Sequence, residues 1–164
     1  MGDPSLSPSR AGRAPNKQIG GLGLFVYGTL LDAEVRALVI GRAMDDAQLV
    51  PAILKNMRRV YIAGRLYPMV IPRRGDSVPG LLLSGLSAED YARLDAFEGA
   101  DYRRERQAVW PADAAEPVNA WFYRTRGAGP RPTARLWELE AWRARDKAPF
   151  LRDARAWIAE LAAR

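Results

Sequence analysis

Residues 24–40 constrain the fold most, because they predict a buried strand that stops at a glycine and is followed by a helix. Residues 24–27 are apolar and strand-favouring throughout, which is typical of a central strand. Gly28 indicates a sharp turn, since glycine accepts backbone angles that other residues avoid. Asp32 is suited to cap a helix over residues 33–40. The turn would expose backbone N–H groups that can bind an anion, although an ordinary strand-to-helix connection explains the same pattern.

Short strands dominate the middle of the chain and follow one another with few helices between them. Their order predicts an α+β fold in which a small mixed β-barrel is flanked by helices. It argues against a doubly wound parallel sheet, in which helices alternate with the strands. The hydrophobic pattern predicts strands over residues 48–54, 58–62, 69–71, 78–84, 102–110 and 118–125, with a surface turn at residues 73–76.

The chain is expected to form one domain with a leader. Its length of 164 residues favours a single core, which we assign to residues 24–164. Residues 1–23 are polar and contain several prolines, so they predict a disordered leader. No apolar run approaches the ~20 residues of a membrane-spanning helix, and the leader lacks the apolar segment of a secretory signal. We therefore expect a cytoplasmic protein that does not contact membranes.

The C-terminal residues 133–164 predict a helical arm within this domain. Thr133 is suited to cap a helix over residues 134–147, Pro149 interrupts it, and residues 150–163 form a last helix. Three tryptophans of the arm are interpreted as core or docking residues: Trp137, Trp142 and Trp157.

Composition restricts the chemistry. The chain has no cysteine and no histidine, which excludes a Ser-His-Asp triad, a histidine-bound zinc and a cysteine nucleophile. Acid–base catalysis near neutral pH would need a carboxylate of raised pKa, a lysine of lowered pKa or a tyrosine. The formal net charge of +6 raises the alternative of nucleic-acid binding. The arginines, however, are spread among acidic residues, so a solvated basic surface without nucleic acid is the preferred interpretation.

Glu98 is the candidate acid–base group. A capping box at residues 87–90 begins a helix that runs to about Phe97, with Leu94 and Phe97 on its apolar face. Glu98 follows at the helix end, before the expected C-cap Gly99. Burial and the negative end of the helix would both raise the pKa of this carboxyl group. A glutamate that hydrogen-bonds to the loop backbone is the alternative.

Six short motifs together resemble the gamma-glutamylcyclotransferase-like family, also called AIG2-like. The resemblance covers roughly residues 24–125, and the first and fourth motifs together are specific. The motifs are Phe25-Val26-Tyr27-Gly28-Thr29-Leu30-Leu31, Leu66-Tyr67-Pro68, Val78-Pro79-Gly80-Leu81-Leu82, Leu94-Asp95-Ala96-Phe97-Glu98-Gly99, Tyr102-Arg103-Arg104 and Asn119-Ala120-Trp121-Phe122-Tyr123.

This resemblance implies a function and a site. The family converts a γ-glutamyl amide to 5-oxoproline and a free amine, with no metal and no cofactor, and its fold is a small mixed β-barrel with flanking helices. Glu98 would be the catalytic acid–base. The substrate's glutamyl group would be bound by residues of the turn and by two further tyrosines: Tyr27, Gly28, Thr29, Leu30, Tyr67 and Tyr102.

Leu30 distinguishes two branches of the family. The glutathione-pathway branch has Asn at this place, whereas the chain resembles gamma-glutamylamine cyclotransferase, whose turn also ends in Thr-Leu. The resemblance therefore favours γ-glutamyl amines as substrates. A non-catalytic module that binds a small carboxylate or a protein on the same fold is the alternative, and we expect a monomer or a homodimer.

Overall fold

A mixed sheet that closes on itself organises the computed structural model, which describes residues 21–164. The strand order β3-β1-β5-β4-β2-β6, together with pairing of β2 and β3, gives a closed five-stranded barrel with β6 added at one edge. The strands are β1 (Leu24–Val26), β2 (Leu49–Ile62), β3 (Pro68–Leu83), β4 (Tyr102–Pro111), β5 (Val118–Thr125) and β6 (Pro132–Leu136). The predicted small mixed β-barrel is confirmed.

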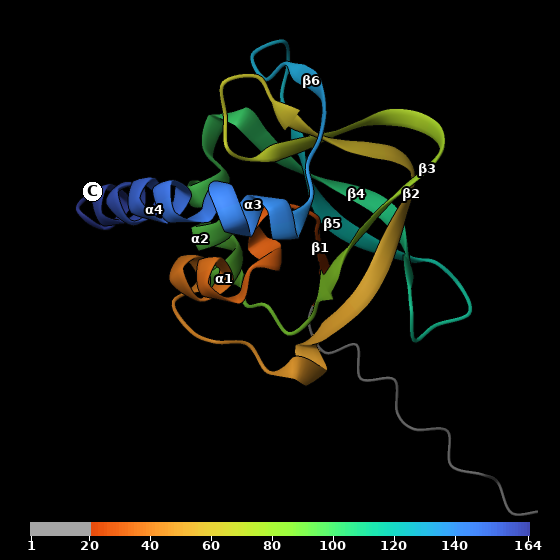
Figure 1. Ribbon diagram of the computed structural model, residues 1–164. Helices are drawn as coiled ribbons and strands as arrows, with labels where there is room; N and C mark the ends of the chain where they lie inside the picture. Colours follow the sequence, from red (N-terminus) through yellow and green to blue (C-terminus); the bar gives the residue numbers. More distant parts are fainter. Residues whose placement is uncertain (1–20) are drawn as a thin grey trace, which may run out of the picture.

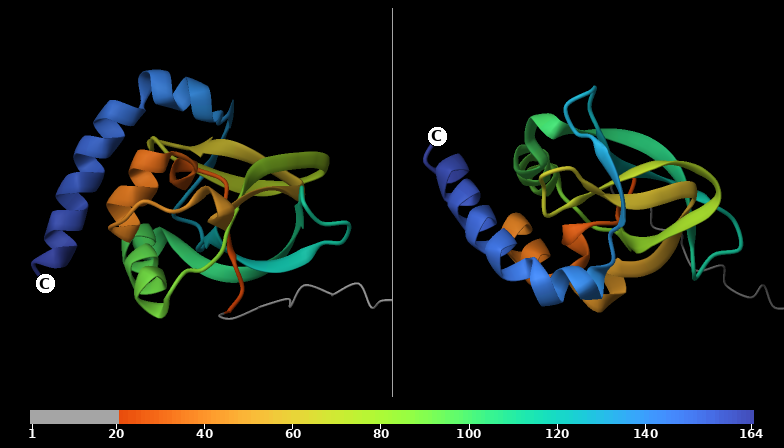
Figure 2. Two further views of the ribbon diagram at one scale, coloured as in Figure 1. Left: turned by 90° about the horizontal axis from the view of Figure 1, so that it is seen from below. Right: turned by 45° about the horizontal axis from the view of Figure 1, so that its top comes forward.

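Four α-helices gather on one side of the barrel, as Figures 1 and 2 show. They are α1 (Ala33–Ile40), α2 (Ala88–Glu98), α3 (Leu139–Arg145) and α4 (Lys147–Ala162), with 3-10 turns η1 (Thr29–Leu31), η2 (Asp46–Gln48) and η3 (Gly99–Asp101). α4 lies against both α1 and α2. No helix in residues 21–164 combines the length and apolar character needed to cross a membrane. Most of the predicted leader, residues 1–20, lies outside the described residues.

Strand β1 is central, as predicted, because it pairs antiparallel with β3 and parallel with β5. All three of its residues are buried. Phe25 belongs to the core inside the barrel, whereas Leu24 and Val26 belong to the core between the barrel and the helices. The strand therefore separates two hydrophobic cores, and the turn that follows it emerges between barrel and helices.

The helix boundaries predicted near the site are confirmed in detail. The Asp32 carboxylate accepts hydrogen bonds from the N–H groups of Glu34 and Val35 and so caps α1. Gly41 ends this helix in the left-handed conformation, with φ of 87°. Ser87 and Asp90 form the expected capping box at the start of α2.

Two predicted pairs of short strands are instead two long, bent strands. Residues 48–54 and 58–62 join into β2, while residues 69–71 and 78–84 join into β3. The predicted turn at residues 73–76 is wrong, because it is a bulge within β3 opposite Asn56. Asn56 adopts φ of 60°, and its side-chain oxygen accepts a hydrogen bond from the Gly75 N–H at 3.1 Å. A bulge bends the strand without ending it, so turn-forming residues within a bulge are easily mistaken for the end of a strand.

The predicted helix over residues 134–147 is wrong in its first part and correct in its second, where residues 139–145 form α3. Its first residues form β6, where Leu136 pairs with Val60 of β2. The Thr133 hydroxyl donates a hydrogen bond to the Tyr61 carbonyl at 2.8 Å instead of capping a helix. Pro149 does not interrupt the arm but lies in the first turn of α4, where its missing N–H is not needed.

Charged and aromatic side chains dock the arm on the rest of the molecule. Besides capping α1, Asp32 pairs with Arg143 at 2.9 Å and with Lys147 at 3.0 Å. Trp137 and Trp142 are completely buried, which confirms their interpretation as core residues. Trp157 is only partly buried and lines a cavity described below.

The close approach of β3 to its neighbour β1 at Gly80 predicts that a larger residue at this position destabilises the protein. A Cβ atom there would overlap the Val26 carbonyl oxygen and lie 2.6 Å from the Phe25 ring. We expect Gly80→Ala to lower the free energy of unfolding by about 1–3 kcal/mol, since the strands must move apart. Urea denaturation measures this. Gly129→Ala is the control, because nothing lies within 4 Å of its Cβ position. Equal stability of both variants would contradict the close approach of the two strands at Gly80.

Candidate active site

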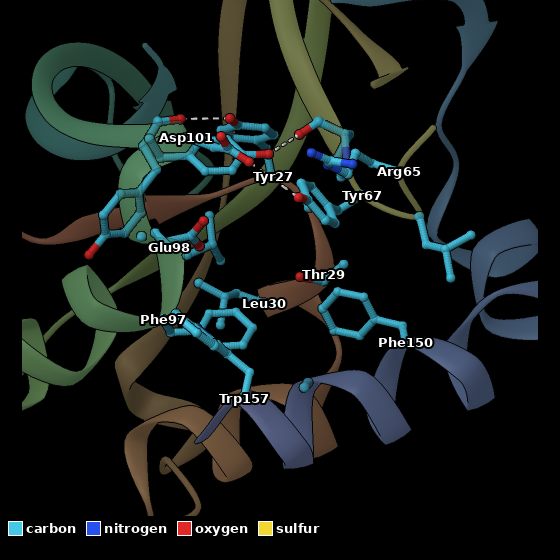
Figure 3. Close-up of a pocket in the computed structure, with 18 of the residues that line it drawn as sticks. Tyr27, Thr29, Leu30, Arg65, Tyr67, Phe97, Glu98, Asp101, Phe150 and Trp157 are labelled. Atoms are coloured by element: carbon cyan, nitrogen blue, oxygen red, sulfur yellow. Dashed lines mark hydrogen bonds between the residues drawn. The ribbon is translucent and has the colours of Figure 1, made fainter. Parts of the chain in front are cut away.

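A cavity of about 590 Å³ lies between one end of the barrel and α4. All seven residues predicted for the site line it: Tyr27, Gly28, Thr29, Leu30, Tyr67, Glu98 and Tyr102. Figure 3 shows the cavity with Tyr27, Tyr67, Arg65 and Asp101 at one end and with Leu30, Phe97, Phe150 and Trp157 at the other. Glu98 and Thr29 lie between the two ends.

In the turn after β1, glycine is required for a reason other than the one predicted from the sequence. Gly28 has φ of −118°, so a left-handed conformation is not the reason. A Cβ atom at Gly28 would lie only 3.0 Å from the Pro68 ring. The close approach of this turn to the start of β3 therefore requires glycine. The same contact brings together the motif at residues 25–31 and the motif at residues 66–68.

The exposed N–H groups of the turn belong to η1 rather than to α1. The first hydrogen bond of η1 runs from the Leu31 N–H to the Gly28 carbonyl at 3.0 Å. The N–H groups of Thr29 and Leu30 precede it and therefore have no partner within η1. The N-terminus of α1 is already capped by Asp32. The N–H groups that the sequence suggested for anion binding therefore lie in the 3-10 turn, ahead of the capped start of α1.

Two buried guanidinium groups hold the carbonyl groups of this turn. Arg36 donates hydrogen bonds to the carbonyls of Leu30 at 3.0 Å and Leu31 at 2.8 Å. Arg59 donates to the Tyr27 carbonyl at 2.8 Å. Because the carbonyl and N–H of one peptide point in opposite directions, the contact with Arg59 directs the Gly28 N–H to the side away from Arg59. The two positive charges also favour an anion at the turn.

Glu98 ends α2 and carries the acidic group most suited to acid–base chemistry. Burial raises the pKa of its carboxyl group to about 8, with a smaller contribution from the negative charge of Asp95. The predicted rise is confirmed. No hydrogen bond to the loop backbone contributes to the shift, so the alternative role of Glu98 finds no support. Asp95 itself is paired with Arg104 at 2.7 Å.

The tyrosines of the cavity are neutral hydrogen-bonding groups. The Tyr27 hydroxyl donates to the Tyr123 carbonyl at 2.6 Å, and the Tyr102 hydroxyl donates to the Pro68 carbonyl at 2.8 Å. Burial is the main cause of the raised pKa of both hydroxyl groups. Each oxygen retains a lone pair that can accept a hydrogen bond from a ligand. Tyr67 makes a longer contact, 3.4 Å from its hydroxyl to the Asp101 carboxylate.

The sequence suggested that the C-terminal arm could shape the leaving-group side of a pocket, but it did not identify the residues of this wall. Phe150, Ala154 and Trp157 of α4 line it, and Phe97 continues the same apolar wall from α2. Three of these residues belong to the helix predicted over residues 150–163, where Trp157 was interpreted as a core or docking residue. Nothing in that pattern distinguishes a face that covers a cavity from one that fills the core. Within residues 21–164 no cluster of three or more acidic side chains is placed to hold a metal ion.

Fold and site together define a barrel in which a carboxyl group of raised pKa and the turn after β1 line one cavity, and comparison with known proteins identifies its class. The family model described as "Gamma-glutamyl cyclotransferase, AIG2-like" matches residues 24–144. The chain therefore belongs to this family.

Individual relatives agree with this assignment. AIG2-like protein C of Arabidopsis thaliana is 31% identical over 128 residues, covering 78% of this chain and 73% of the relative. A solution structure of another Arabidopsis thaliana protein is 28% identical with a TM-score of 0.60, covering 80% of this chain and 87% of that one. A solved gamma-glutamyl cyclotransferase shares the fold with a TM-score of 0.56 at 17% identity, covering 69% and 72%.

The half-buried Glu98 predicts a pH-dependent difference in the free energy of unfolding. Its pKa is 4.5 as an ordinary glutamate and about 8 in the folded protein. The folded state thus favours the protonated form, and this contribution to stability is complete below pH 4.5 and is lost as pH rises to about 8. Glu98→Gln, which resembles the protonated form, should gain stability relative to the parent over this range, by a few kcal/mol at most.

Urea denaturation at pH 5, 7 and 9 measures this difference. The matched control is Glu160→Gln, at an exposed position of α4, and its difference from the parent should not vary with pH. A difference for Glu98→Gln that is the same at all three values would show that Glu98 is ionised at low pH in the folded protein.

Proposed function

We propose that this protein is a gamma-glutamyl cyclotransferase that releases 5-oxoproline and a free amine from a γ-glutamyl amide. The observation that supports the proposal is the meeting, in one cavity, of a carboxyl group with a pKa of about 8 and the first N–H groups of η1, which have no partner within that turn. The family assignment supports a fold of the cyclotransferase type. The reaction needs neither histidine nor cysteine, and the chain contains neither.

The turn binds the substrate's α-carboxylate in this proposal. The N–H groups of Gly28, Thr29 and Leu30 donate hydrogen bonds to it, as successive backbone N–H groups do in anion-binding turns. Arg36 and Arg59 support the same negative charge from behind the turn, through the carbonyl groups that they hold. The hydroxyl oxygens of Tyr27 and Tyr102 accept hydrogen bonds from the α-ammonium group.

Glu98 then moves two protons in turn. Its carboxylate takes a proton from the α-ammonium, and the freed amine attacks the γ-carbonyl carbon of the same molecule. A new C–N bond closes the five-membered ring, and Glu98 returns the proton to the leaving nitrogen as its bond to carbon breaks. The ring nitrogen then gives up its second proton through Glu98 to the released amine, which departs as an ammonium ion. The raised pKa of Glu98 makes this proton transfer less unfavourable than it would be to an ordinary carboxylate.

Placement supplies much of the rate in this scheme. The attacking nitrogen and the carbonyl carbon belong to one molecule, so the cavity has only to hold it in a folded-back conformation. Binding at the turn fixes one end of the glutamyl group, and Tyr67 and Tyr102 line its path toward Glu98. The proposal requires a small-molecule substrate and no cofactor. A cytoplasmic location, the absence of nucleic-acid partners and a monomeric or homodimeric state stay predictions from the sequence.

Glu98→Gln tests the mechanism. We expect kcat/KM for 5-oxoproline release to fall by about 10²–10⁴-fold on every γ-glutamyl amide that the parent converts, because the proton transfer is lost. Glu160→Gln is the control and should keep parental activity. Full activity of Glu98→Gln would exclude the mechanism. Binding of glutamate analogues in calorimetry, with no turnover of any amide by the parent, would support a binding module instead.

The pH dependence provides a second test. The carboxylate form of Glu98 is the base, so kcat/KM of the parent should rise with pH toward about 8. The rise of kcat with pH should occur at lower pH than the rise of kcat/KM, because a bound α-ammonium beside the carboxylate of Glu98 favours its ionised form. Steady-state rates from pH 5 to 9 give both profiles. A kcat/KM that is constant between pH 5 and 8 would contradict Glu98 as the base.

A further inference from the structure

We propose that the wall formed by α4 and the end of α2 binds the leaving amine and selects an apolar, aromatic amine without a carboxylate. This inference rests on the proposed function and names its substrate class. Phe150 and Trp157 are the specificity-determining residues.

The cavity has two chemically different ends. The N–H groups of the turn, the tyrosine hydroxyls and Glu98 occupy one end and the middle, and the apolar side chains occupy the other end (Figure 3). If the glutamyl group lies on the turn with its γ-carbonyl near Glu98, the leaving nitrogen is directed toward the second end. Leu30, Phe97, Phe150 and Trp157 surround that space.

The aromatic wall is rigid on one side and accessible on the other. Phe150 packs edge-to-face against Trp142, with 5.4 Å between ring centroids, and against Phe97, with 6.5 Å. Because Trp142 is completely buried, it fixes the ring of Phe150 from behind. Trp157 is only partly buried and faces the cavity from α4. An aromatic amine can stack on such a preformed wall with little ordering of side chains.

Charge excludes a second carboxylate from this end. Among the lining residues of the described chain, Arg65 is the single cation, and it lies beside Tyr67 at the opposite end of the cavity. The other charged lining residues are the acids Glu98, Asp101 and Asp153. Among the lining residues, a leaving group with its own carboxylate, as in a γ-glutamyl amino acid, would meet no cation at the apolar end and would meet the carboxylate of Asp153. Arg164 lies over the Trp157 ring, 5.5 Å from its guanidinium carbon to the ring centroid, but does not line the cavity.

The wall is a feature of this chain's C-terminal helix. The family model ends at residue 144, whereas the aromatic residues of the wall on α4 lie at positions 150 and 157. The turn and Glu98 fall within the matched region. The proposed chemistry and the proposed choice of amine therefore reside in different segments of the chain.

Three substrates test the selection: γ-glutamylphenethylamide, γ-glutamylethylamide and γ-glutamylphenylalanine. We expect kcat/KM of the parent to be at least about tenfold higher for the phenethylamide than for each of the other two. Trp157→Ala should lower the ratio between phenethylamide and ethylamide by about tenfold, and Trp157→Phe should restore most of it. Glu160→Ala, at an exposed position of α4, is the control and should keep the parental ratio.

A binding experiment separates this inference from the proposed function. Calorimetry with Glu98→Gln compares the affinities for the three amides whether or not the parent converts them. Turnover without preference for the phenethylamide, or a preference unchanged by Trp157→Ala, overturns the aromatic subsite and leaves the cyclotransferase proposal standing. No turnover but tighter binding of the phenethylamide, lost in a Glu98→Gln/Trp157→Ala double variant, supports the subsite and overturns the catalytic proposal.

Discussion

The guanidinium group of Arg59 is the contact on which the barrel, the turn and the arm all depend. It is buried on β2 and donates hydrogen bonds to the carbonyls of Tyr27 at 2.8 Å, Pro79 at 3.2 Å and Trp137 at 2.8 Å. These three carbonyls come from the end of β1, from β3 and from the segment after β6. One cation therefore binds backbone groups of three distant segments, and its contacts with Tyr27 and Trp137 are buried, where a carbonyl without a partner would be costly.

Glu98 differs from neighbouring acidic residues because it has no ion-pair partner among the described residues. Asp95 is paired with Arg104, and Asp32 is paired with Arg143 and Lys147. Glu98 has no such cation among its described neighbours, so burial acts on it without compensation and raises its pKa. A chain without histidine thereby gains a group that titrates near neutral pH. The destabilisation that accompanies an unpaired buried carboxylate is typical of residues kept for function.

Local signals in the sequence were sufficient for the segments that form the polar end of the site. The cap at Asp32, the capping box at Ser87 and the neighbouring strands β4 and β5 depend on local residues, and each was predicted correctly. The turn after β1 and Glu98 lie at the ends of such segments. The resemblance of short motifs then joined them into one site, which the structure places around one cavity.

The remaining features depend on pairing between distant residues. Asn56 bends β2 and lets it stay paired with β3, although the sequence there contains turn-forming residues. The segment before Trp137 is held as β6 by the edge of β2, against its predicted helical character. The role of α4 in the cavity follows from its docking through Asp32 and Trp142. Such contacts override local propensity and leave no periodic signal in the sequence.

Asp32 has a consequence for how this molecule can diversify. The same carboxylate begins α1 directly after η1 and anchors Lys147 at the first residue of α4. The arm is thus fastened beside the turn at a point that does not involve the aromatic face it presents. Substitutions along that face can reshape the apolar end of the cavity, while the ion pair of Asp32 with Lys147 and the residues at the polar end keep their positions. A family built this way can acquire new preferences through its last helix alone.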